Sequence, residues 1–436
     1  MKQSFYGGVH PNDRKELARH KEVAPLSAAP KQVVIAMAMH VGAPCKPIVA
    51  VGDQVKVGQK IGEIAGLGAP IHASVSGVVK AVEPRPYVGG GKVMSVVIEN
   101  DFQDTWGSVL TPHPDYSKLS CEEIVEIVKE AGITGMGGAG FPTHVKISSG
   151  VGKVDTLILN GAECEPYITS DNRCFLEDTH HVLGGIKAVM KYLNIPKCII
   201  GIEGNKPEAI AKMKAAIDAP GIEVKQLPCR YPQGAEKVLI ENCTGREVPF
   251  PGLPSDVGVI VMNVTSVAFV SKYLETGMPL TTKRLTVDGD IVKEPKNVEV
   301  LIGTPIQELL DFCGGLTAQP GKVLYGGPMM GTCVADLSQP ILKNNNAVLA
   351  FSEKLARLPK KTNCIHCGRC VNACPLGLAA KDIVKAYDNG NVELLQELNA
   401  DLCMSCGTCS FVCPAKRPLA PSIALAKIMM KNGGKK

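Results

Sequence analysis

One cysteine pattern, C-x2-C-x2-C-x3-C-P, occurs twice near the C-terminal end, at 364–375 and at 403–414. Three thiolates at this spacing can hold one iron–sulfur cluster, and in two-cluster ferredoxins the fourth cysteine, before proline, ligates the other cluster. Zinc ligands, the alternative, usually come in two separated pairs. The pattern therefore predicts two [4Fe–4S] clusters with crossed ligands: Cys364, Cys367, Cys370 and Cys413 for one, and Cys403, Cys406, Cys409 and Cys374 for the other.

The composition limits the classes of protein that this chain can belong to. Its 436 residues, 45% of them hydrophobic, are enough for roughly two to four domains. The net charge of +5 is too small to indicate a nucleic-acid partner. Nine of the 17 cysteines lie outside the motifs without regular spacing, which is typical of free thiols in a reducing compartment. Because the chain has no leader-like start and no apolar run of roughly 18 residues, we expect a cytoplasmic protein that does not cross the membrane.

Strand and helix patterns divide the chain into five segments, and together they predict a multidomain α/β protein. An amphipathic helix is expected between the two cysteine motifs, at 381–398, which favours a helical two-cluster ferredoxin domain. The expected segments are an N-terminal arm at 1–30, short strands with glycine turns at 31–114, alternating helices and strands at 115–255, a mixed module at 256–340 and the cluster domain at 355–436.

The strand-rich segment resembles the biotinyl/lipoyl barrel-sandwich hybrid fold. The resemblance rests on Val51-Gly-Asp-Gln-Val-Lys-Val-Gly-Gln-Lys-Ile and on Ala73-Ser-Val-Ser-Gly-Val-Val. That family carries its prosthetic group on a hairpin lysine, but the matching hairpin at 65–70 has no lysine. The resemblance therefore implies a structural domain and not a swinging arm.

A glycine-rich stretch at 135–142 satisfies G-x-G-x-x-G. The dinucleotide-binding fingerprint requires a strand before the glycines, whereas a helix is expected here, so a Rossmann interpretation lacks its usual context. Glycines still let backbone N–H groups approach a phosphate, a following helix N-terminus favours an anion, and Lys146 can neutralise its charge. The alternative is a structural turn.

The stretches Gly135–Lys146, Asn160–Pro166 and Tyr231–Glu236, with Asn263 further on, resemble the 51-kDa flavoprotein subunit of complex I, and the resemblance covers roughly 115–335. Three of that family's positions differ: Ala162 and Ala235 replace acidic residues, and Cys164 replaces a serine. The resemblance implies a Rossmann-like domain with noncovalent FMN reduced by NADH, followed by a β-grasp (SLBB) module, with Glu165 and Glu236 shaping the nicotinamide pocket as the catalytic residues. The cofactor-binding residues that it implies are Gly135, Gly137, Gly138, Gly140, Phe141, Lys146, Asn160, Glu163, Tyr231, Gly234, Phe250 and Asn263.

The order of the domains, with two cluster motifs at the end, resembles the RnfC family, which belongs to the Rnf complexes, the ion-translocating ferredoxin:NAD⁺ oxidoreductases. The stretches Phe5-Tyr-Gly-Gly-Val-His-Pro and Gly326-Gly-Pro-Met-Met-Gly331 support this resemblance. It implies an enzyme subunit that passes electrons between NAD(H), FMN and two [4Fe–4S] clusters. FMN is needed between the other two because a nicotinamide exchanges two electrons and a cluster only one. The implied partners are the other Rnf subunits and, through them, ferredoxin. The implied location is peripheral, on the cytoplasmic face of the membrane.

Two other functions are compatible with these modules. One is a corrinoid reductase of bacterial microcompartments, in which the barrel-sandwich segment is expected after the flavin region. The other is a non-catalytic electron-wiring subunit that has lost flavin, which Ala162 and Ala235 would explain. Reduction of cobalamin would indicate the first, and a flavin spectrum would exclude the second.

Overall fold

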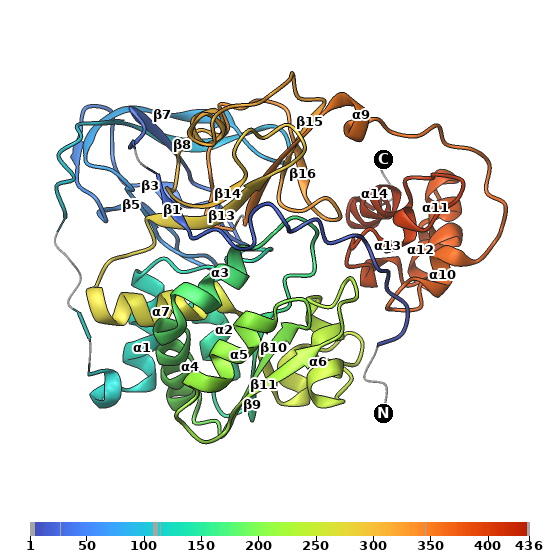
Figure 1. The fold of residues 1–436 in the computed structure, drawn as a ribbon, viewed down its shortest axis with the longest axis horizontal. Helices are drawn as coiled ribbons and strands as arrows, with labels where there is room; N and C mark the ends of the chain where they lie inside the picture. Colours follow the sequence, from blue (N-terminus) through green and yellow to red (C-terminus); the bar gives the residue numbers. More distant parts are fainter. Residues whose placement is uncertain (1–4, 27, 108–111, 114, 345, 434–436) are drawn as a thin grey trace.

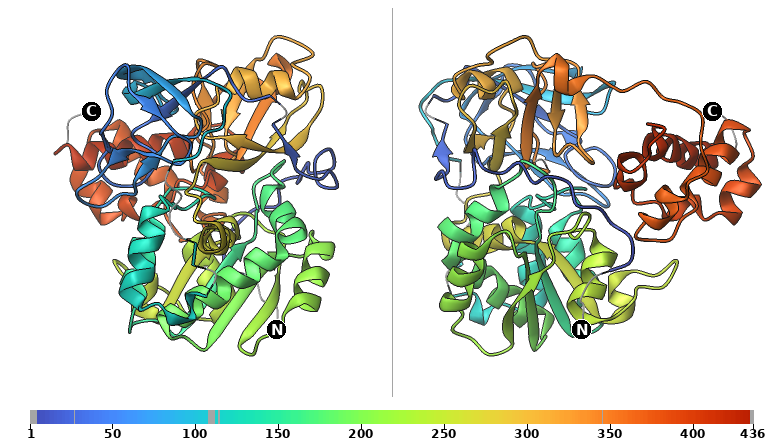
Figure 2. Two further views of the ribbon diagram at one scale, coloured as in Figure 1. Left: turned by 90° about the vertical axis from the view of Figure 1, so that its left-hand side faces the viewer. Right: turned by 45° about the vertical axis from the view of Figure 1, so that its right-hand side comes forward.

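The computed structural model describes residues 5–26, 28–107, 112–113, 115–344 and 346–433 (Figure 1). The N-terminal strands and the mixed module lie together above a helix-rich α/β part, and the cysteine-rich helices lie to one side (Figures 1 and 2). No helix among the described residues is both long and apolar enough to cross a membrane.

The strand-rich segment forms two small antiparallel sheets, in the orders β2-β8-β7-β4 and β3-β5-β6. Alternating apolar side chains such as Val33, Ile35, Val96 and Ile98 are fully buried, which explains why these short strands hold together. The strands are β2 (Gln32–Ala36), β3 (Lys46–Pro47), β4 (Gln54–Val55), β5 (Lys60–Glu63), β6 (Ile71–His72), β7 (Gly77–Pro86) and β8 (Lys92–Asn100).

The α/β part is built on a parallel sheet with the strand order β11-β10-β9-β12. The alternating helices and strands expected at 115–255 are confirmed. The strands are β9 (Thr156–Gly161), β10 (Lys197–Glu203), β11 (Ile222–Leu227) and β12 (Val259–Asn263). The helices are α1 (Cys121–Glu130), α2 (Thr143–Gly150), α3 (Ser170–Glu177), α4 (Thr179–Leu193), α5 (Pro207–Ala216), α6 (Glu236–Thr244) and α7 (Val264–Thr276), with the 3₁₀ turns η1 (Tyr116–Lys118) and η2 (Pro254–Val257).

Strand β12 and helix α7 correct one expected boundary. The sequence analysis assigned 256–276 to the following module, but β12 pairs in parallel with β9, and α7 packs on α4. The strand is apolar on both faces, as is usual for a strand inside a parallel sheet. The structure therefore places 256–276 in the α/β part.

The mixed module is a six-stranded sheet in the order β1-β14-β13-β17-β15-β16. One edge strand, β1, comes from the N-terminal arm and pairs in parallel with β14. The elements are β1 (Ala24–Pro25), β13 (Thr282–Asp288), β14 (Lys296–Leu301), α8 (Ile306–Phe312), β15 (Lys322–Tyr325), β16 (Thr332–Val334) and β17 (Ala347–Phe351), followed by the short helix α9 (Glu353–Ala356).

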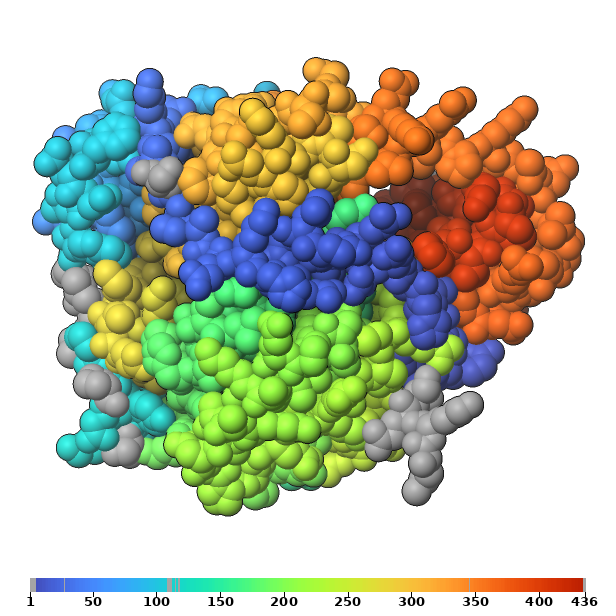
Figure 3. Space-filling view, in the orientation of Figure 1, coloured from blue at the N-terminus to red at the C-terminus, as the bar shows by residue number. Residues whose placement is uncertain are grey.

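Residues 5–26 form more than an arm, and we call them the N-terminal strap. The strap crosses the boundary between the upper sheets and the α/β part and reaches the cysteine-rich helices (Figure 3). Gly8 N–H donates to the Ala373 carbonyl at 2.9 Å, and Val9 and Tyr231 exchange two backbone hydrogen bonds at 2.8 Å. Further along, the buried Lys15 ammonium donates to the Glu163 carbonyl at 2.7 Å. The strap thus contacts three of the four parts of the molecule directly.

The two cysteine motifs fold alike. In each, the residue before the second cysteine, His366 or Ser405, has a positive φ, and so does the glycine that follows that cysteine, Gly368 or Gly407. Each glycine begins a one-turn helix that carries the third cysteine. The helices of this domain are α10 (Arg369–Asn372), α11 (Ala380–Asp388), α12 (Val392–Glu397), α13 (Thr408–Phe411) and α14 (Leu419–Lys431), with the 3₁₀ turn η3 (Ala400–Leu402).

The single helix expected at 381–398 is in fact two helices, α11 and α12. Gly390, with φ of 68°, interrupts it, and the Asn391 side chain accepts a hydrogen bond from Leu394 N–H at 2.9 Å to cap α12. A glycine with positive φ ends one helix and the asparagine cap begins the next, although the amphipathic pattern continues across both.

Candidate functional site

A cavity of about 680 Å³ opens where strands β9 and β12 end. From β9 the chain continues to β10 and β11 on one side of β9, whereas β12, which comes later, pairs with β9 on its other side. The strand order therefore reverses at β9. Such a switch point, at the carboxyl ends of parallel strands, is where open α/β sheets bind ligands. The strand-end residues Asn160 and Asn263 are register partners, and both line the cavity.

The glycine loop supplies one wall of this cavity. Gly137, Gly138 and Ala139 line it, whereas Gly135 and Gly140 lie at the base of the loop. Gly135 N–H donates to the Phe141 carbonyl at 2.8 Å and closes that base. A side chain at Gly138 would meet no atom within 4 Å, so it would project into open space. Backbone groups at this tip are therefore free to approach a bound phosphate. Helix α2, which follows the loop, contributes no residue to the lining.

Buried lysines hold the glycine loop from neighbouring domains. Lys283 of β13 donates to the Met136 carbonyl at 2.6 Å. Lys343 donates to the carbonyls of Gly132 and Pro70, at 2.8 and 2.7 Å. Burial lowers the pKa of each of these two ammonium groups to about 7. Because a buried ammonium needs its hydrogen bonds, these contacts fix the loop against the mixed module and the barrel sandwich.

Glu163 lines the cavity in a left-handed backbone conformation, with φ of 49°. A non-glycine residue in this region costs about 1–3 kcal/mol, and such outliers gather at functional sites. Its carboxylate accepts a hydrogen bond from Asp171 N–H at 2.6 Å and lies 3.9 Å from the Lys15 ammonium. Burial raises the pKa of Glu163, and burial lowers the pKa of Lys15. The strap thus places a cation beneath one of the cavity's carboxylates.

Glu165 joins the α/β part to the mixed module. Its carboxylate accepts hydrogen bonds from the N–H groups of Met329 and Met330, at 3.0 and 2.9 Å. Gly327 packs so closely on this side chain that an added Cβ would clash with it. Burial raises the pKa of the Glu165 carboxyl to about 7. Glu165 is therefore a carboxylate that titrates near neutral pH on the cavity wall.

This shifted pKa predicts a pH dependence of stability. A carboxyl whose pKa rises from 4.5 to about 7 on folding stabilises the chain fully below 4.5, and this contribution is lost as the pH rises through 7. Glu165→Gln has no proton to lose. We expect its melting temperature to fall less than that of the parent chain between these two pH values, as measured by anaerobic thermal melts. Equal falls in the two proteins would contradict the assignment.

Glu236 begins helix α6 at the cavity edge, and its carboxylate pairs with the Lys146 ammonium at 3.0 Å. Lys146 also donates to the Val261 carbonyl at 2.8 Å and lies 6.0 Å from the centre of the Phe141 ring. Phe250 is 54% exposed and, like Phe141, does not line the cavity. A role for these two rings in cofactor binding therefore stays a prediction.

The structure brings together most of the predicted flavin-site residues but not all. Those that line the cavity are Gly137, Gly138, Asn160, Glu163, Glu165, Tyr231, Gly234, Glu236 and Asn263. Gly135, Gly140, Phe141 and Lys146 support the wall from behind, and Phe250 lies elsewhere.

Several lining residues had no signal in the sequence analysis. Asp171 accepts hydrogen bonds from the Asn263 amide and the Thr265 hydroxyl, both at 2.9 Å, and so ties α3 to the start of α7. Asn344 lines the cavity with a buried side-chain oxygen that has no partner among the described residues. The stretch 326–331 also lines it, and its glycine-rich composition was the one available signal.

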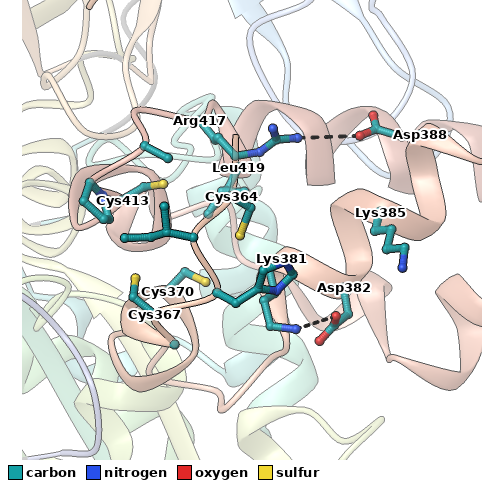
Figure 4. Close-up of a pocket in the computed structure, with 15 residues that line it drawn as sticks. Cys364, Cys367, Cys370, Lys381, Asp382, Lys385, Asp388, Cys413, Arg417 and Leu419 are labelled. Carbon is teal, nitrogen blue, oxygen red and sulfur yellow. Dashed lines mark hydrogen bonds and ion pairs between the residues drawn. The ribbon is translucent and has the colours of Figure 1, made fainter. Parts of the chain in front are cut away.

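The cysteines surround two separate cavities. Cys364, Cys367, Cys370 and Cys413 line a cavity of about 260 Å³ at the outer side, which we call the outer site (Figure 4). Cys374, Cys403, Cys406 and Cys409 line a smaller one, of about 20 Å³, which we call the inner site. In each site the fourth cysteine comes from the other motif. This is the grouping that the crossed assignment requires, and none of these cysteines forms a disulfide.

The inner site adjoins the large cavity. Leu376, Leu402 and Met404 line that cavity, and Leu376 and Met404 also line the inner site. The buried Tyr231 hydroxyl, from the cavity wall, donates to the Cys406 carbonyl at 2.7 Å. The cysteine-rich helices therefore form one wall of the cavity at the switch point.

The residues present fit both implied cofactors. The glycine tip offers open space and free backbone groups, the unpartnered Asn344 oxygen can accept a hydrogen bond, and the cavity walls mix apolar and polar side chains, as flavin rings require. Four converging thiols are soft donors of the kind that iron–sulfur clusters take. Gly137–Ala139 would hold a flavin phosphate, and the two cysteine sets would each hold one cluster.

Comparison with family models identifies four domains in the expected order. The models describe an RnfC barrel sandwich hybrid domain at 3–103, a Nuo51 FMN-binding domain at 128–272, an SLBB domain at 284–332 and a 4Fe-4S dicluster domain at 363–416. These matches confirm the predicted fold class and the FMN and [4Fe–4S] cofactors. They also place the barrel sandwich before the flavin domain, which is not the order expected of a corrinoid reductase.

Several RnfC proteins of known complexes are similar over most of the chain. The chain is 46% identical to the one from the proton-translocating ferredoxin:NAD(+) oxidoreductase complex of Clostridium ljungdahlii, over 87% of this chain and 83% of that one. It is 44% identical to the one from the Na(+)-translocating complex of Acetobacterium woodii, over 97% and 96%. Identity to the one from the ion-translocating oxidoreductase complex of Vibrio cholerae is 38%, over 87% of this chain but only 49% of that longer relative.

A solved structure shares the fold at much lower identity. An NAD⁺-reducing [NiFe]-hydrogenase in the H2-reduced state matches 74% of this chain and 64% of its own, with 19% identity and a TM-score of 0.51. This likeness concerns the fold alone. The sequence relatives, which agree along nearly the whole length, identify the family: the chain belongs to the RnfC proteins of ion-translocating ferredoxin:NAD⁺ oxidoreductase complexes.

Proposed function

We propose that this chain exchanges electrons with NAD(H) through FMN and carries them along two [4Fe–4S] clusters to or from the rest of an Rnf-type membrane complex. The observation that carries the proposal is the shared wall between the flavin-domain cavity and the inner cysteine site. A redox cavity that abuts a cluster site, with Tyr231 bridging the two, is built for electron transfer between them.

The side chains around the cavity bind and position, and they carry out little acid–base chemistry. When bound, FMN supplies the conversion between two-electron exchange with a nicotinamide and one-electron exchange with a cluster. The glycine tip would hold the phosphate, and Asn160 and Asn263 would border the ring system from the two strand ends. Glu165 and Glu236 border the space for the nicotinamide, and the apolar Leu402 and Met404 exclude water on the cluster side.

The order of the carriers follows from the layout. The inner site adjoins the flavin cavity, whereas the outer site lies beyond it, and its Cys364 and Cys367 are exposed. Electrons from NADH would therefore pass from flavin to the inner cluster, then to the outer cluster, and leave there. The reverse route would serve reduction of NAD⁺.

The partners follow from the family. As an RnfC protein, this chain is one component of a membrane-associated complex, and we propose that it is held peripherally on the cytoplasmic face, where NADH is available. Ferredoxin would exchange electrons with it only through the other subunits. One relative is named as proton-translocating and another as Na(+)-translocating, so the coupling ion stays open.

The proposal is tested by the flavin chemistry of the purified chain. We expect a bound-FMN spectrum that NADH bleaches under anaerobic conditions, and NADH oxidation with ferricyanide as acceptor. Glu236→Ala should retain FMN but raise the KM for NADH about tenfold, because a charged group that positions the dinucleotide is lost. Glu241→Ala, an exposed carboxylate on the same helix that does not line the cavity, is the matched control.

Two outcomes would contradict the proposal. A chain that carries clusters but no flavin would be an electron-wiring subunit. A chain whose flavin NADH does not bleach, but which reduces cobalamin, would be a corrinoid reductase.

A further inference from the structure

The segment that leads to the outer site carries a strong excess of positive charge. Between residues 354 and 381 the sequence contains six lysines and arginines and no aspartate or glutamate. The excess is local, because the whole chain has a net charge of only +5. The six are Lys354, Arg357, Lys360, Lys361, Arg369 and Lys381.

These cations exceed what the cluster site itself uses. Lys381, Lys385 and Arg417 line the outer cavity, where they can offset the negative charge of a thiolate-bound cluster, and two of them pair with Asp382 and Asp388 (Figure 4). The other five of the six are exposed, do not line that cavity and form no ion pair with any described residue. Their charge is therefore available to a partner.

Exposed apolar side chains accompany this charge. Ile365, between the first two cysteines of the outer site, is 67% exposed. Leu358 on the connector is 79% exposed, and Leu355 in α9 is 57% exposed. Apolar side chains at the centre with charged groups around them are the usual anatomy of a protein–protein interface. We call the exposed surface of Lys360, Lys361, Ile365 and Arg369, which flank Cys364 and Cys367 in the chain, the exit face.

The exit face adjoins the outer site, because Ile365 lines the outer cavity between Cys364 and Cys367. The connector from α9 arches over the outside of the cluster domain before it reaches Cys364, and only Thr362 of its last residues bonds to the domain, at 3.0 Å to the Ala415 carbonyl (Figures 1 and 2). Any carrier that exchanges electrons with the outer cluster at its exposed edge must therefore approach this surface.

We propose that the exit face docks the acidic surface of a redox protein, which exchanges electrons with the outer cluster at Ile365. The inference rests on the proposed function, because it takes the outer cluster as the last carrier in this chain. Charge complementarity favours a partner whose carboxylates surround its own redox centre. Such contacts act mainly on the association rate and weaken with salt. The same charges could attract anionic lipid, which is a different occupant that the test must separate.

The test uses a charge-reversed pair and a matched control. Lys360→Glu/Lys361→Glu reverses two charges on the exit face, and Lys56→Glu/Lys92→Glu reverses two exposed lysines of the barrel sandwich. Each variant, with its clusters verified by iron content and absorption, is reduced with dithionite and mixed with membrane complex from which this chain has been removed. The rate of electron transfer into the complex is then followed by stopped-flow at several ionic strengths.

We expect the exit-face pair to transfer electrons about tenfold more slowly at low salt, with a flatter salt dependence, and the control pair to change less than about twofold. Ile365→Ser should slow transfer without changing the salt dependence, because it removes apolar contact and no charge. Equal rates in the parent chain and the exit-face pair would overturn the proposal. The proposal would also be overturned if the exit-face pair lost binding to protein-free phosphatidylglycerol vesicles to an extent that accounts for its whole loss of transfer rate. The occupant of the exit face would then be lipid.

Reduction with dithionite makes the test of docking independent of the proposed function, because it needs neither NADH nor flavin. If NADH failed to bleach the flavin, the function would be wrong, but the dithionite-reduced clusters would still report on docking. If NADH bleached the flavin normally in the exit-face pair while transfer to the complex stayed at the parent rate, the docking surface alone would be wrong.

Discussion

Cys374→Ala is expected to stop NADH from reducing either cluster, while NADH still bleaches the flavin at its normal rate. Cys374 belongs to the first motif by sequence, yet its side chain lines the inner site with Cys403, Cys406 and Cys409. Loss of this ligand removes the [4Fe–4S] cluster next to the flavin cavity, and the outer cluster is then cut off from its source of electrons. Anaerobic stopped-flow spectra of flavin and clusters, together with iron counts, measure the effect.

Cys413→Ala is the matched variant, because it removes the fourth ligand of the outer site in the same way. Here NADH should still reduce the inner cluster, and only transfer onward to the complex should be lost. If the two variants exchanged these behaviours, the ligands would not cross between motifs. If Cys374→Ala abolished flavin bleaching with FMN content unchanged, electrons would have to enter through the clusters.

Gly138→Leu is expected to weaken FMN retention about ten- to hundredfold and to leave both clusters intact. A Cβ added at this position meets no protein atom within 4 Å, so a side chain would start in the space where the structure is open for a ligand. Forcing a bound group past such an obstruction costs about 1–3 kcal/mol, which corresponds to this loss of affinity. Flavin released on desalting, quantified by fluorescence, gives the measurement.

Gly66→Leu is the control for that variant. Gly66, in the hairpin of the barrel sandwich, also has open space around it and no positive φ, so the two substitutions differ only in what they face. Iron and sulfide contents should be unchanged in both proteins. Normal FMN binding by Gly138→Leu would contradict the role of the glycine loop.

Local signals account for most of what the sequence predicted correctly. The alternation of helix and strand expected at 115–255 is present, from α1, which Ser120 and Glu123 cap, to the buried strand β9 and beyond. The cysteine motifs predicted which thiols gather, because ligand spacing is itself a local property. Predictions failed where tertiary pairing decides: β12 joins the sheet of an earlier domain, and Gly390 divides one expected helix.

The candidate site shows the same division. Motif residues such as Gly138, Glu163 and Glu165 were predicted, because the family's pattern places them together. Lys15 and Asp171 have no motif of their own, and their roles depend on chain segments that meet only in the folded structure. Asn344 likewise reaches the cavity from a third domain. Such residues become visible only once the path of the chain is known.

The N-terminal strap has a consequence for how the protein is made. Residues 8 and 9 leave the ribosome among the first, but one of their partners, Ala373, is synthesised near the end. Domains generally fold as they emerge, so Val9 can pair with Tyr231 early, whereas Gly8 can bond to Ala373 only after the cysteine-rich helices exist. Attachment of the strap to the cysteine-rich helices is thus a late step of folding.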